Sequence, residues 1–325
     1  MCRKCCSSTY IARSTIKPFP GFNSEDDADT LHSAMKGLGT DEDDIINILT
    51  SRNNAQRQHI IKAYSENFGK DLIDDLKSEL GGHLESIIEG LMLTPAVYDA
   101  MELKNSMNGV GTDEETLAEI LTTRTNNQIC DIVATYRSEY ESNLKEDIES
   151  ESSSDFEDFL VTLLKGKRDE TYYVDQSLVQ KDVAALRAAG EDKWGTDEKE
   201  FIKILCRRNF FHLRAVFEAY DQQINKDIED TIQDEMSGSM QMGILTLSTF
   251  FLSPLVCFLT VEYGCGTADK ILIRVMISRS EIDMQNIKEE FTKLCGKTLA
   301  EFIQDDIGGD YQKVLLRLCG VDEEE

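Results

Sequence analysis

The stretch Gly37-Leu38-Gly39-Thr40 decides the fold of this chain of 325 residues, because the same pattern returns three more times. The later copies are Gly109-Val110-Gly111-Thr112, Lys193-Trp194-Gly195-Thr196 and Gly264-Cys265-Gly266-Thr267. Successive threonines are 72, 84 and 71 residues apart. This regular period indicates a structural unit of about 70 residues that is present four times, with about a dozen extra residues between the second and third copies.

Three further kinds of residue keep a fixed distance from each threonine. An arginine follows by 12 residues, an aromatic residue by 24 and a carboxylate by 39. These residues are Arg52, Arg124, Arg208 and Arg279; Tyr64, Tyr136, Tyr220 and Phe291; and Glu79, Glu151, Glu235 and Asp306. Agreement at three distances in four units establishes an internal repeat.

The apolar residues within each unit have helical spacing. Ile45, Ile48 and Leu49 follow the i, i+3, i+4 pattern after the first threonine, and the other units have similar patterns. We expect four or five helices in each unit and no strand. Thr40 and Thr112 are predicted to cap the helices that follow them, because an acidic residue stands three positions after each.

The repeat register also predicts the domain boundaries. Residues 1–22 match no unit and are expected to form an N-terminal tail, and residues 166–176 a charged connector. The four repeats are expected at residues 24–93, 96–165, 177–250 and 252–321.

The composition restricts the function. The chain has 34 lysines and arginines against 61 aspartates and glutamates, and this net charge of −27 argues against unaided binding to nucleic acid or acidic lipid. Nine cysteines and the lack of a signal peptide favour a reducing, cytoplasmic compartment. Residues 242–261 carry no charge and are long enough to span a membrane, but Ser253-Pro254 interrupts them, so we expect two buried helices instead.

The glycine pattern and the distant acid suit a hard cation. Glycine tolerates positive φ, which lets a loop turn its carbonyl oxygens inward. Ca²⁺ takes about six to eight oxygen ligands, commonly carbonyls together with a carboxylate. A carboxylate 39 residues later could return through a helical hairpin to complete the ligand shell. A tight turn between helices is the plainer interpretation of one copy, but four copies with an acid at the same distance favour calcium.

The sequence resembles the annexin family over residues 24–321. The segments that carry the resemblance are Met35-Lys36-Gly37-Leu38-Gly39-Thr40-Asp41-Glu42, Asp74-Asp75-Leu76-Lys77-Ser78-Glu79-Leu80, Lys193-Trp194-Gly195-Thr196-Asp197-Glu198 and Ser278-Arg279-Ser280-Glu281-Ile282-Asp283. The resemblance implies an all-α, curved disc of four repeats, each a right-handed superhelix of five helices. It also implies calcium loops on the convex face that bridge the protein to anionic phospholipid.

The calcium ligands are carried over from the family one position at a time. For each site the resemblance implies three loop carbonyls and the downstream carboxylate. The four sets are Met35, Gly37, Gly39 and Glu79; Met107, Gly109, Gly111 and Glu151; Gly190, Lys193, Gly195 and Glu235; and Glu262, Gly264, Gly266 and Asp306. The resemblance also implies a weaker metal site around the Thr40 carbonyl with Glu42.

Two departures from the family pattern concern the second and fourth sites. Gly82, Gly238 and Gly309 stand three residues after their acids, whereas the second unit has Ser154, which predicts a stiffer loop. The fourth threonine follows the third acid by only 32 residues, which predicts an abbreviated join through Pro254 and an altered fourth site.

Several single residues have two interpretations. Trp194, the only tryptophan, is either a packed aromatic residue or a loop tip that contacts the membrane interface, where tryptophan is favoured. The four repeated arginines are expected to be structural and to lie near helix ends. The resemblance also matches five residues to the lining of a polar channel, which we expect to be a salt-bridge network between repeats: Asp99, Glu102, Glu119, Arg124 and Arg279.

The sequence therefore predicts a non-enzymatic, cytoplasmic protein that binds anionic phospholipid membranes peripherally and in a calcium-dependent manner. No nucleophile elbow, metalloprotease helix or histidine pair points to catalysis. Membrane linking or scaffolding fits the repeats, and an ion-conducting or purely structural membrane scaffold is the alternative. The N-terminal tail is a candidate contact for a protein partner, with Cys2, Cys5 and Cys6 either unmodified or S-acylated, and self-association on membranes is left open.

Overall fold

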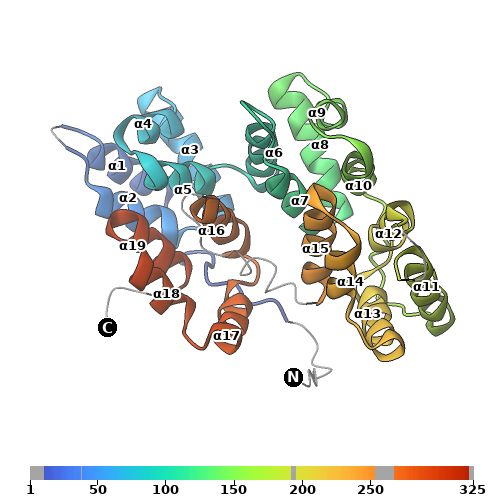
Figure 1. Ribbon diagram of the computed structural model, residues 1–325. Helices are drawn as coiled ribbons and strands as arrows, with labels where there is room; N and C mark the ends of the chain where they lie inside the picture. Colours follow the sequence, from blue (N-terminus) through green and yellow to red (C-terminus); the bar gives the residue numbers. More distant parts are fainter. Residues whose placement is uncertain (1–10, 38, 192–194, 253–266, 322–325) are drawn as a thin grey trace. The chain divides into compact units, whose positions relative to one another are not determined.

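The computed structural model describes residues 11–37, 39–191, 195–252 and 267–321. Within these residues all regular secondary structure is helical, with nineteen α-helices and no strand (Figure 1). The helical organisation that the apolar spacing predicts is therefore present in every repeat.

Repeats 1 to 3 each contain five helices, and repeat 4 has four within the described residues. Repeat 1 consists of α1 (Ser24–Ala34), α2 (Glu42–Ser51), α3 (Asn54–Phe68), α4 (Leu72–Glu79) and α5 (Gly82–Met92). Repeat 2 consists of α6 (Pro95–Ser106), α7 (Glu114–Thr123), α8 (Asn126–Tyr140), α9 (Leu144–Glu151) and α10 (Ser154–Leu164). Repeat 3 consists of α11 (Gln176–Ala189), α12 (Glu198–Leu205), α13 (Phe210–Ile224), α14 (Ile228–Glu235) and α15 (Gly238–Leu252). Repeat 4 contains α16 (Thr267–Arg279), α17 (Met284–Cys295), α18 (Leu299–Asp306) and α19 (Gly309–Leu318).

Aspartate, not threonine, caps the helix after each of the first two glycine loops. Asp41 and Asp113 precede α2 and α7, and each carboxylate accepts a hydrogen bond from the backbone N–H three residues on. The prediction that Thr40 and Thr112 cap these helices is therefore wrong by one residue. Because a carboxylate satisfies the orphan N–H groups of the first turn, the threonine hydroxyl is released for another partner.

The helices form two compact units. The first contains Met1–Thr94 with Phe258–Glu325, and therefore repeats 1 and 4; the second is Pro95–Cys257, with repeats 2 and 3. In the first unit α5 packs against α16, and α19 packs against α2. In the second unit α10 packs against α12, and α15 against α7. In each unit, the last helix of one repeat thus packs against the helix that follows the glycine loop of the other repeat.

The repeated arginine joins the first two helices in each of repeats 1 to 3. Its guanidinium makes two hydrogen bonds, of 2.6 to 2.9 Å, to an aspartate of the first helix. The pairs are Arg52 with Asp27, Arg124 with Asp99 and Arg208 with Asp182. In repeat 4, Arg279 bonds Asp283 at 2.8 Å. These partly buried two-bond pairs support the structural role that the sequence predicts for the arginines.

The apolar stretch that begins at residue 242 is partly in the core. Its first part belongs to α15, in which Ile244 and Leu247 are fully buried. A Cβ on Gly243 would lie 2.8 Å from the ring of Phe159, so glycine permits the close approach of α15 to α10. Among the described residues no helix is long and apolar enough to cross a membrane. Residues 253–261 lie outside the described part of the chain.

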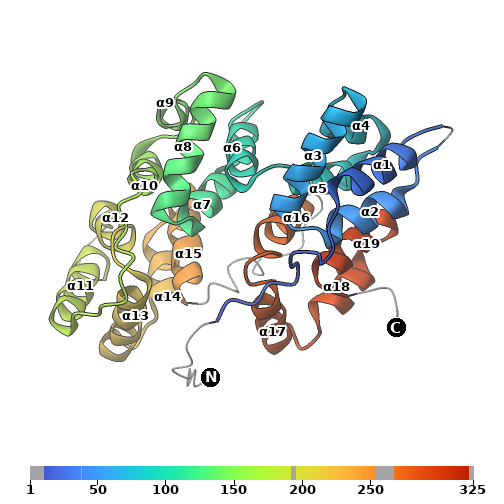
Figure 2. The ribbon, with the colours of Figure 1, turned by 180° about the vertical axis from the view of Figure 1, so that it is seen from behind.

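The segment of residues 11–22 runs along the first unit and contacts both of its repeats (Figure 2). Arg13 forms an ion pair of 2.6 Å with Glu289 of α17. At the other end Phe19 exchanges two hydrogen bonds with the side chain of Gln56 in α3, at 2.9 and 3.0 Å. The described part of the N-terminal tail therefore links repeat 4 to repeat 1.

Candidate metal centre

The two glycines of the loop have similar backbone φ angles in repeats 1 and 2. Gly37 and Gly39 have φ of 118° and 94°, and Gly109 and Gly111 have 107° and 89°. A Cβ added to any of them would meet nothing within 4 Å, so glycine is required by the backbone angle and not by a lack of space. These positive angles give the loops the freedom to turn their carbonyls that the sequence analysis expects.

A backbone hydrogen bond closes the neck of each described loop. The N–H of the residue after the threonine donates to the carbonyl of a residue at the end of the preceding helix. The bonds are Asp41 to Ala34 at 2.9 Å, Asp113 to Ser106 at 2.8 Å and Asp197 to Ala189 at 2.9 Å. The neck of the loop is thus closed in the same way in three repeats.

In every repeat the repeated acid ends the helix that precedes the last helix. Glu79, Glu151, Glu235 and Asp306 are the last residues of α4, α9, α14 and α18, and each of these helices has eight residues. Glu235 is half-buried and the other three acids are exposed. The acid therefore has the same place in the helical order of all four repeats.

The threonine of the first two loops contacts the acid 39 residues away. Thr40 Oγ1 donates to Glu79 Oε2 at 2.7 Å. Thr112 Oγ1 lies 3.2 Å from both the backbone oxygen and Oε2 of Glu151. The downstream carboxylate therefore returns to the glycine loop, as the spacing argument requires.

The third loop makes the same connection through the backbone. Thr196 Oγ1 donates to the backbone oxygen of Glu235 at 2.6 Å. Gly195 in this loop has φ of 84°, whereas Gly190 is the C-cap of α11 with φ of −113°. The predicted ligand Lys193 and the predicted membrane contact Trp194 lie outside the described residues, as do Glu262, Gly264 and Gly266 of the fourth site.

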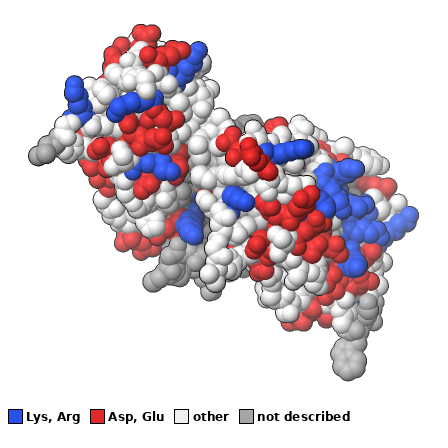
Figure 3. Space-filling model, turned by 90° about the horizontal axis from the view of Figure 1, so that it is seen from above, with Lys and Arg blue, Asp and Glu red and all other residues white. Residues whose placement is uncertain are grey.

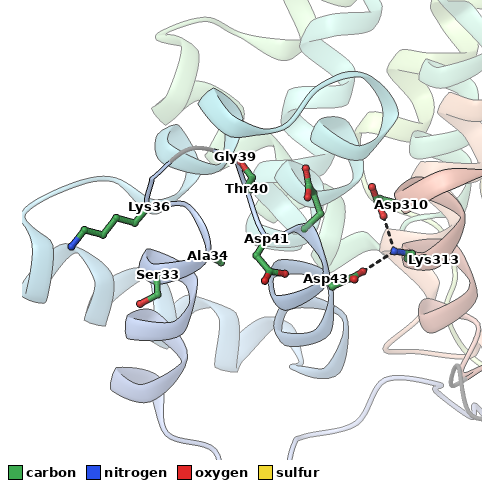
Figure 4. Close-up of a pocket in the computed structure, with 10 residues that line it drawn as sticks. Ser33, Ala34, Lys36, Gly39, Thr40, Asp41, Asp43, Asp310 and Lys313 are labelled. Atoms are coloured by element: carbon green, nitrogen blue, oxygen red, sulfur yellow. Dashed lines mark hydrogen bonds and ion pairs between the residues drawn. The ribbon is translucent and has the colours of Figure 1, made fainter.

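Beside the first loop lies an open pocket of about 490 Å³ (Figure 4). Asp41, Glu42 and Asp43 line it from the loop and the start of α2, and Asp310 and Lys313 from α19. Lys313 Nζ bonds Asp43 at 2.7 Å and Asp310 at 2.9 Å, and these bonds raise the pKa of Lys313 above its ordinary value. The predicted weaker ligand Glu42 thus lines a polar pocket in which one lysine pairs with two of the carboxylates.

In repeats 1 and 2 the repeated aromatic residue anchors the helix that carries the acid, a role that the sequence analysis missed. The hydroxyl of Tyr64 donates to Asp75 of α4 at 2.7 Å, and that of Tyr136 donates to Asp147 of α9 at 2.6 Å. Burial would raise the pKa of Asp147, but the hydrogen bonds from Tyr136, Ser142 and Lys104 outweigh it and lower the pKa below its ordinary value. The signal in the sequence was an aspartate 35 residues after each of the first two threonines.

Ser154 adopts the conformation of the glycines at the same position. Its φ is 57°, close to the values of 62°, 62° and 69° at Gly82, Gly238 and Gly309. The backbone of the second repeat therefore keeps the common turn, and a non-glycine residue bears the steric cost of the left-handed region.

The second loop also exposes an apolar tip that the sequence analysis did not single out. Val110, between the two glycines of this loop, is fully exposed to solvent. The side chain of Met107, whose carbonyl is a predicted ligand, is buried below the loop. Among the described residues no three His, Cys, Asp or Glu side chains converge as a metal cluster.

Comparisons with known proteins cover most of the chain. The family model described as Annexin matches residues 26–91, 98–163, 181–247 and 260–318. Annexin A4 of Homo sapiens is 49% identical over 313 residues, which span 95% of this chain and 98% of that protein. Among solved structures, annexin III has a TM-score of 0.91 at 43% identity and covers 96% of this chain and 98% of its own. The calcium-bound annexin (Sm)1 has a TM-score of 0.83 at 30% identity, covering 96% and 94%. The fold predicted from the four repeats is confirmed.

Proposed function

Because the chain belongs to the annexin family of calcium-dependent phospholipid-binding proteins, we propose that its glycine loops and downstream carboxylates bind Ca²⁺ and thereby attach it to anionic membranes. Annexins are generally non-enzymatic, and no reaction is proposed for this chain. The proposal concerns which residues hold the ion and which residues meet the lipid.

The first site offers the oxygen ligands that this ion prefers. The carbonyls of Met35, Gly37 and Gly39 and the carboxylate of Glu79 would form the ligand set, in an exposed loop that leaves room for water or a lipid phosphate oxygen. Bound Ca²⁺ supplies the positive charge that a lipid phosphate or carboxylate needs as a partner. The observation that carries the proposal is the 2.7 Å contact between Thr40 and Glu79, which brings loop and carboxylate together.

The other three sites follow the same register. Met107, Gly109, Gly111 and Glu151 repeat the first set, with the same pair of positive glycine angles. The third set, Gly190, Lys193, Gly195 and Glu235, and the fourth, Glu262, Gly264, Gly266 and Asp306, are proposed from the sequence register with Gly190, Gly195, Glu235 and Asp306 described. Thr40 and Glu42 are proposed as a weaker site at the edge of the pocket.

The attachment must be local because the protein as a whole is strongly acidic. Its net charge is −27, and carboxylates are spread over the face shown in Figure 3, with lysine and arginine in smaller groups. At physiological ionic strength charges are screened beyond about 8 Å, so a metal held in a loop can contact lipid while the remaining carboxylates stay solvated and screened. The net charge argues against binding by charge alone, and a metal bridge would supply a local attachment.

Apolar loop tips would add to the metal bridge. Val110 is fully exposed at the second loop, and Trp194 has the equivalent position in the third. Tryptophan prefers the membrane interface, where its ring is apolar and its N–H stays wet. As the only tryptophan, Trp194 should report docking by a shift of its emission toward the blue when calcium and anionic vesicles are both present.

Co-sedimentation with vesicles tests the proposal directly. The full chain is mixed with phosphatidylserine-containing vesicles in calcium or in chelator, and pelleted. We expect pelleting in calcium that is reversed by chelator. A variant with Glu79→Gln, Glu151→Gln, Glu235→Gln and Asp306→Asn should stay in the supernatant while keeping its helical circular dichroism. Equal pelleting in chelator would exclude the metal bridge.

A further inference from the structure

The threonine of the glycine motif has a different partner in each described loop. Its hydroxyl donates to the Glu79 carboxylate in repeat 1, at 2.7 Å. In repeat 3 it donates instead to the backbone oxygen of Glu235, at 2.6 Å. In repeat 2, Thr112 is 3.2 Å from both kinds of oxygen of Glu151. A hydroxyl has one proton to donate. The threonine hydroxyl therefore donates to a different acceptor oxygen, or divides its hydrogen bond between two, depending on the repeat.

None of the other bonds of the first loop depends on this hydroxyl. Asp41 caps α2 with its own carboxylate, and its backbone N–H closes the loop neck on Ala34. Thr40 is half-buried and Glu79 is exposed. An exposed glutamate side chain without a partner samples many rotamers, and ordering it on ligand binding has an entropic cost.

The hydrogen bond is compatible with metal binding by the same carboxylate. An ionised carboxylate has about four lone-pair positions on its two oxygens. Thr40 uses one of them, on Oε2, so both oxygens keep a lone pair for a cation. The hydrogen bond from Thr40 therefore does not have to break before the Glu79 carboxylate can bind a cation through both oxygens.

We propose that Thr40 is a positioning residue that holds the Glu79 carboxylate against the glycine loop before calcium arrives. This inference rests on the calcium site proposed above. The threonine would reduce the ordering that metal binding requires of the carboxylate without itself being a metal ligand through its side chain. In repeat 3 the hydroxyl of Thr196 bonds the backbone at the end of α14 and not the carboxylate. We therefore propose this positioning of the carboxylate for repeat 1 and, in part, for repeat 2.

The test uses Thr40→Val, which keeps the branched shape and removes the hydroxyl, and Thr40→Ser, which keeps the hydroxyl. Both are made in the full chain carrying Glu151→Gln, Glu235→Gln and Asp306→Asn, so that only the first site keeps its acid. Thr30→Val is the matched control, because Thr30 is exposed on α1 and, among the described residues, its hydroxyl bonds the backbone oxygen of Asp26 alone, at 2.8 Å. Glu79→Gln on the same background reports the calcium site itself.

Two measurements are made on each variant. The first is amide hydrogen exchange of residues 79–82 in chelator, which should be faster in Thr40→Val than in the parent and unchanged in Thr40→Ser. The second is the calcium concentration for half-maximal binding to phosphatidylserine vesicles. It should rise about threefold to tenfold in Thr40→Val, the effect of one hydrogen bond to a carboxylate, and stay within about twofold in Thr40→Ser and Thr30→Val.

Each outcome has a distinct meaning. Unchanged exchange in Thr40→Val would show that the hydroxyl does not order the carboxylate end of α4, and would overturn the inference. Faster exchange with an unchanged calcium midpoint would overturn it as well, since positioning would then not serve the metal. If Glu79→Gln leaves the midpoint unchanged, the proposed calcium site is wrong, and the positioning role fails with it.

Discussion

Replacing Ser154 with glycine is expected to stabilise the protein by about 0.5–1 kcal/mol. The φ of Ser154 is 57°, in the left-handed region, where an L-residue with a Cβ costs about 1–2 kcal/mol. Glycine removes that cost but gains about 0.4–1 kcal/mol of freedom in the unfolded chain, which leaves the smaller net gain. The side chain is exposed, and its one hydrogen bond within the described part of the chain goes to Asp155 of its own turn, at 3.2 Å, so little else is lost.

Ser150→Gly is the matched control for this change. Ser150 is an exposed serine of α9, four residues earlier and inside the helix. The same replacement should there destabilise the protein by about 0.5–1 kcal/mol, because glycine is a poor helix former. Chemical unfolding in chelator, followed by circular dichroism, measures both variants.

The sign of the two effects is the decisive result. If Ser154→Gly destabilises the protein as much as Ser150→Gly does, then the left-handed turn at Ser154 is not the conformation in solution. Calcium-dependent vesicle binding gives a second reading. Because the turn of the second repeat already matches that of the glycine-containing repeats, the calcium midpoint of Ser154→Gly should stay within about twofold of the parent; a large gain would favour the stiffer loop that the sequence predicts.

Three further predictions follow from particular contacts. Gly243→Ala should destabilise the protein by about 1–2 kcal/mol in chemical unfolding, because the new Cβ would lie 2.8 Å from the Phe159 ring, a cost of about 1–3 kcal/mol that better helix propensity only partly offsets; wild-type stability would contradict the close packing of α15 on α10. Tyr136→Phe should lower stability at pH 7 by about 1–2 kcal/mol, and the loss should disappear at low pH. The Asp147 pKa is lowered in the folded protein, so its stabilisation is present above the unfolded value of about 4 and is lost as the pH falls through the folded value; a pH-independent loss would point to packing instead. Val110→Ser should weaken calcium-dependent vesicle binding about threefold or more without changing stability, because this fully exposed valine can gain burial only in the membrane; unchanged binding would remove the second loop tip from the lipid contact.

The repeat organisation was determined by the sequence alone. The recurrence of Gly-x-Gly-Thr, with residues at constant distances of 12, 24 and 39, predicted four equivalent units, and the i, i+3, i+4 spacing of their apolar residues predicted that the units are helical. The same spacing predicted that each acid returns to its loop, and in repeats 1 to 3 a hydroxyl bond joins the two. A one-dimensional period is sufficient for such predictions, since it fixes which residues occupy equivalent positions.

The tertiary structure decided what each equivalent residue contacts. The sequence predicted that Thr40 caps α2. In the structure α4 approaches the loop, the hydroxyl of Thr40 donates to Glu79, and Asp41 caps α2 instead. The tertiary structure also paired repeat 1 with repeat 4 and repeat 2 with repeat 3, a choice that no period within one repeat contains. The physical reason is the same in both cases. A hydrogen bond or a helix contact depends on distances of a few ångströms between segments far apart in the chain, and equal spacing along a sequence does not set those distances.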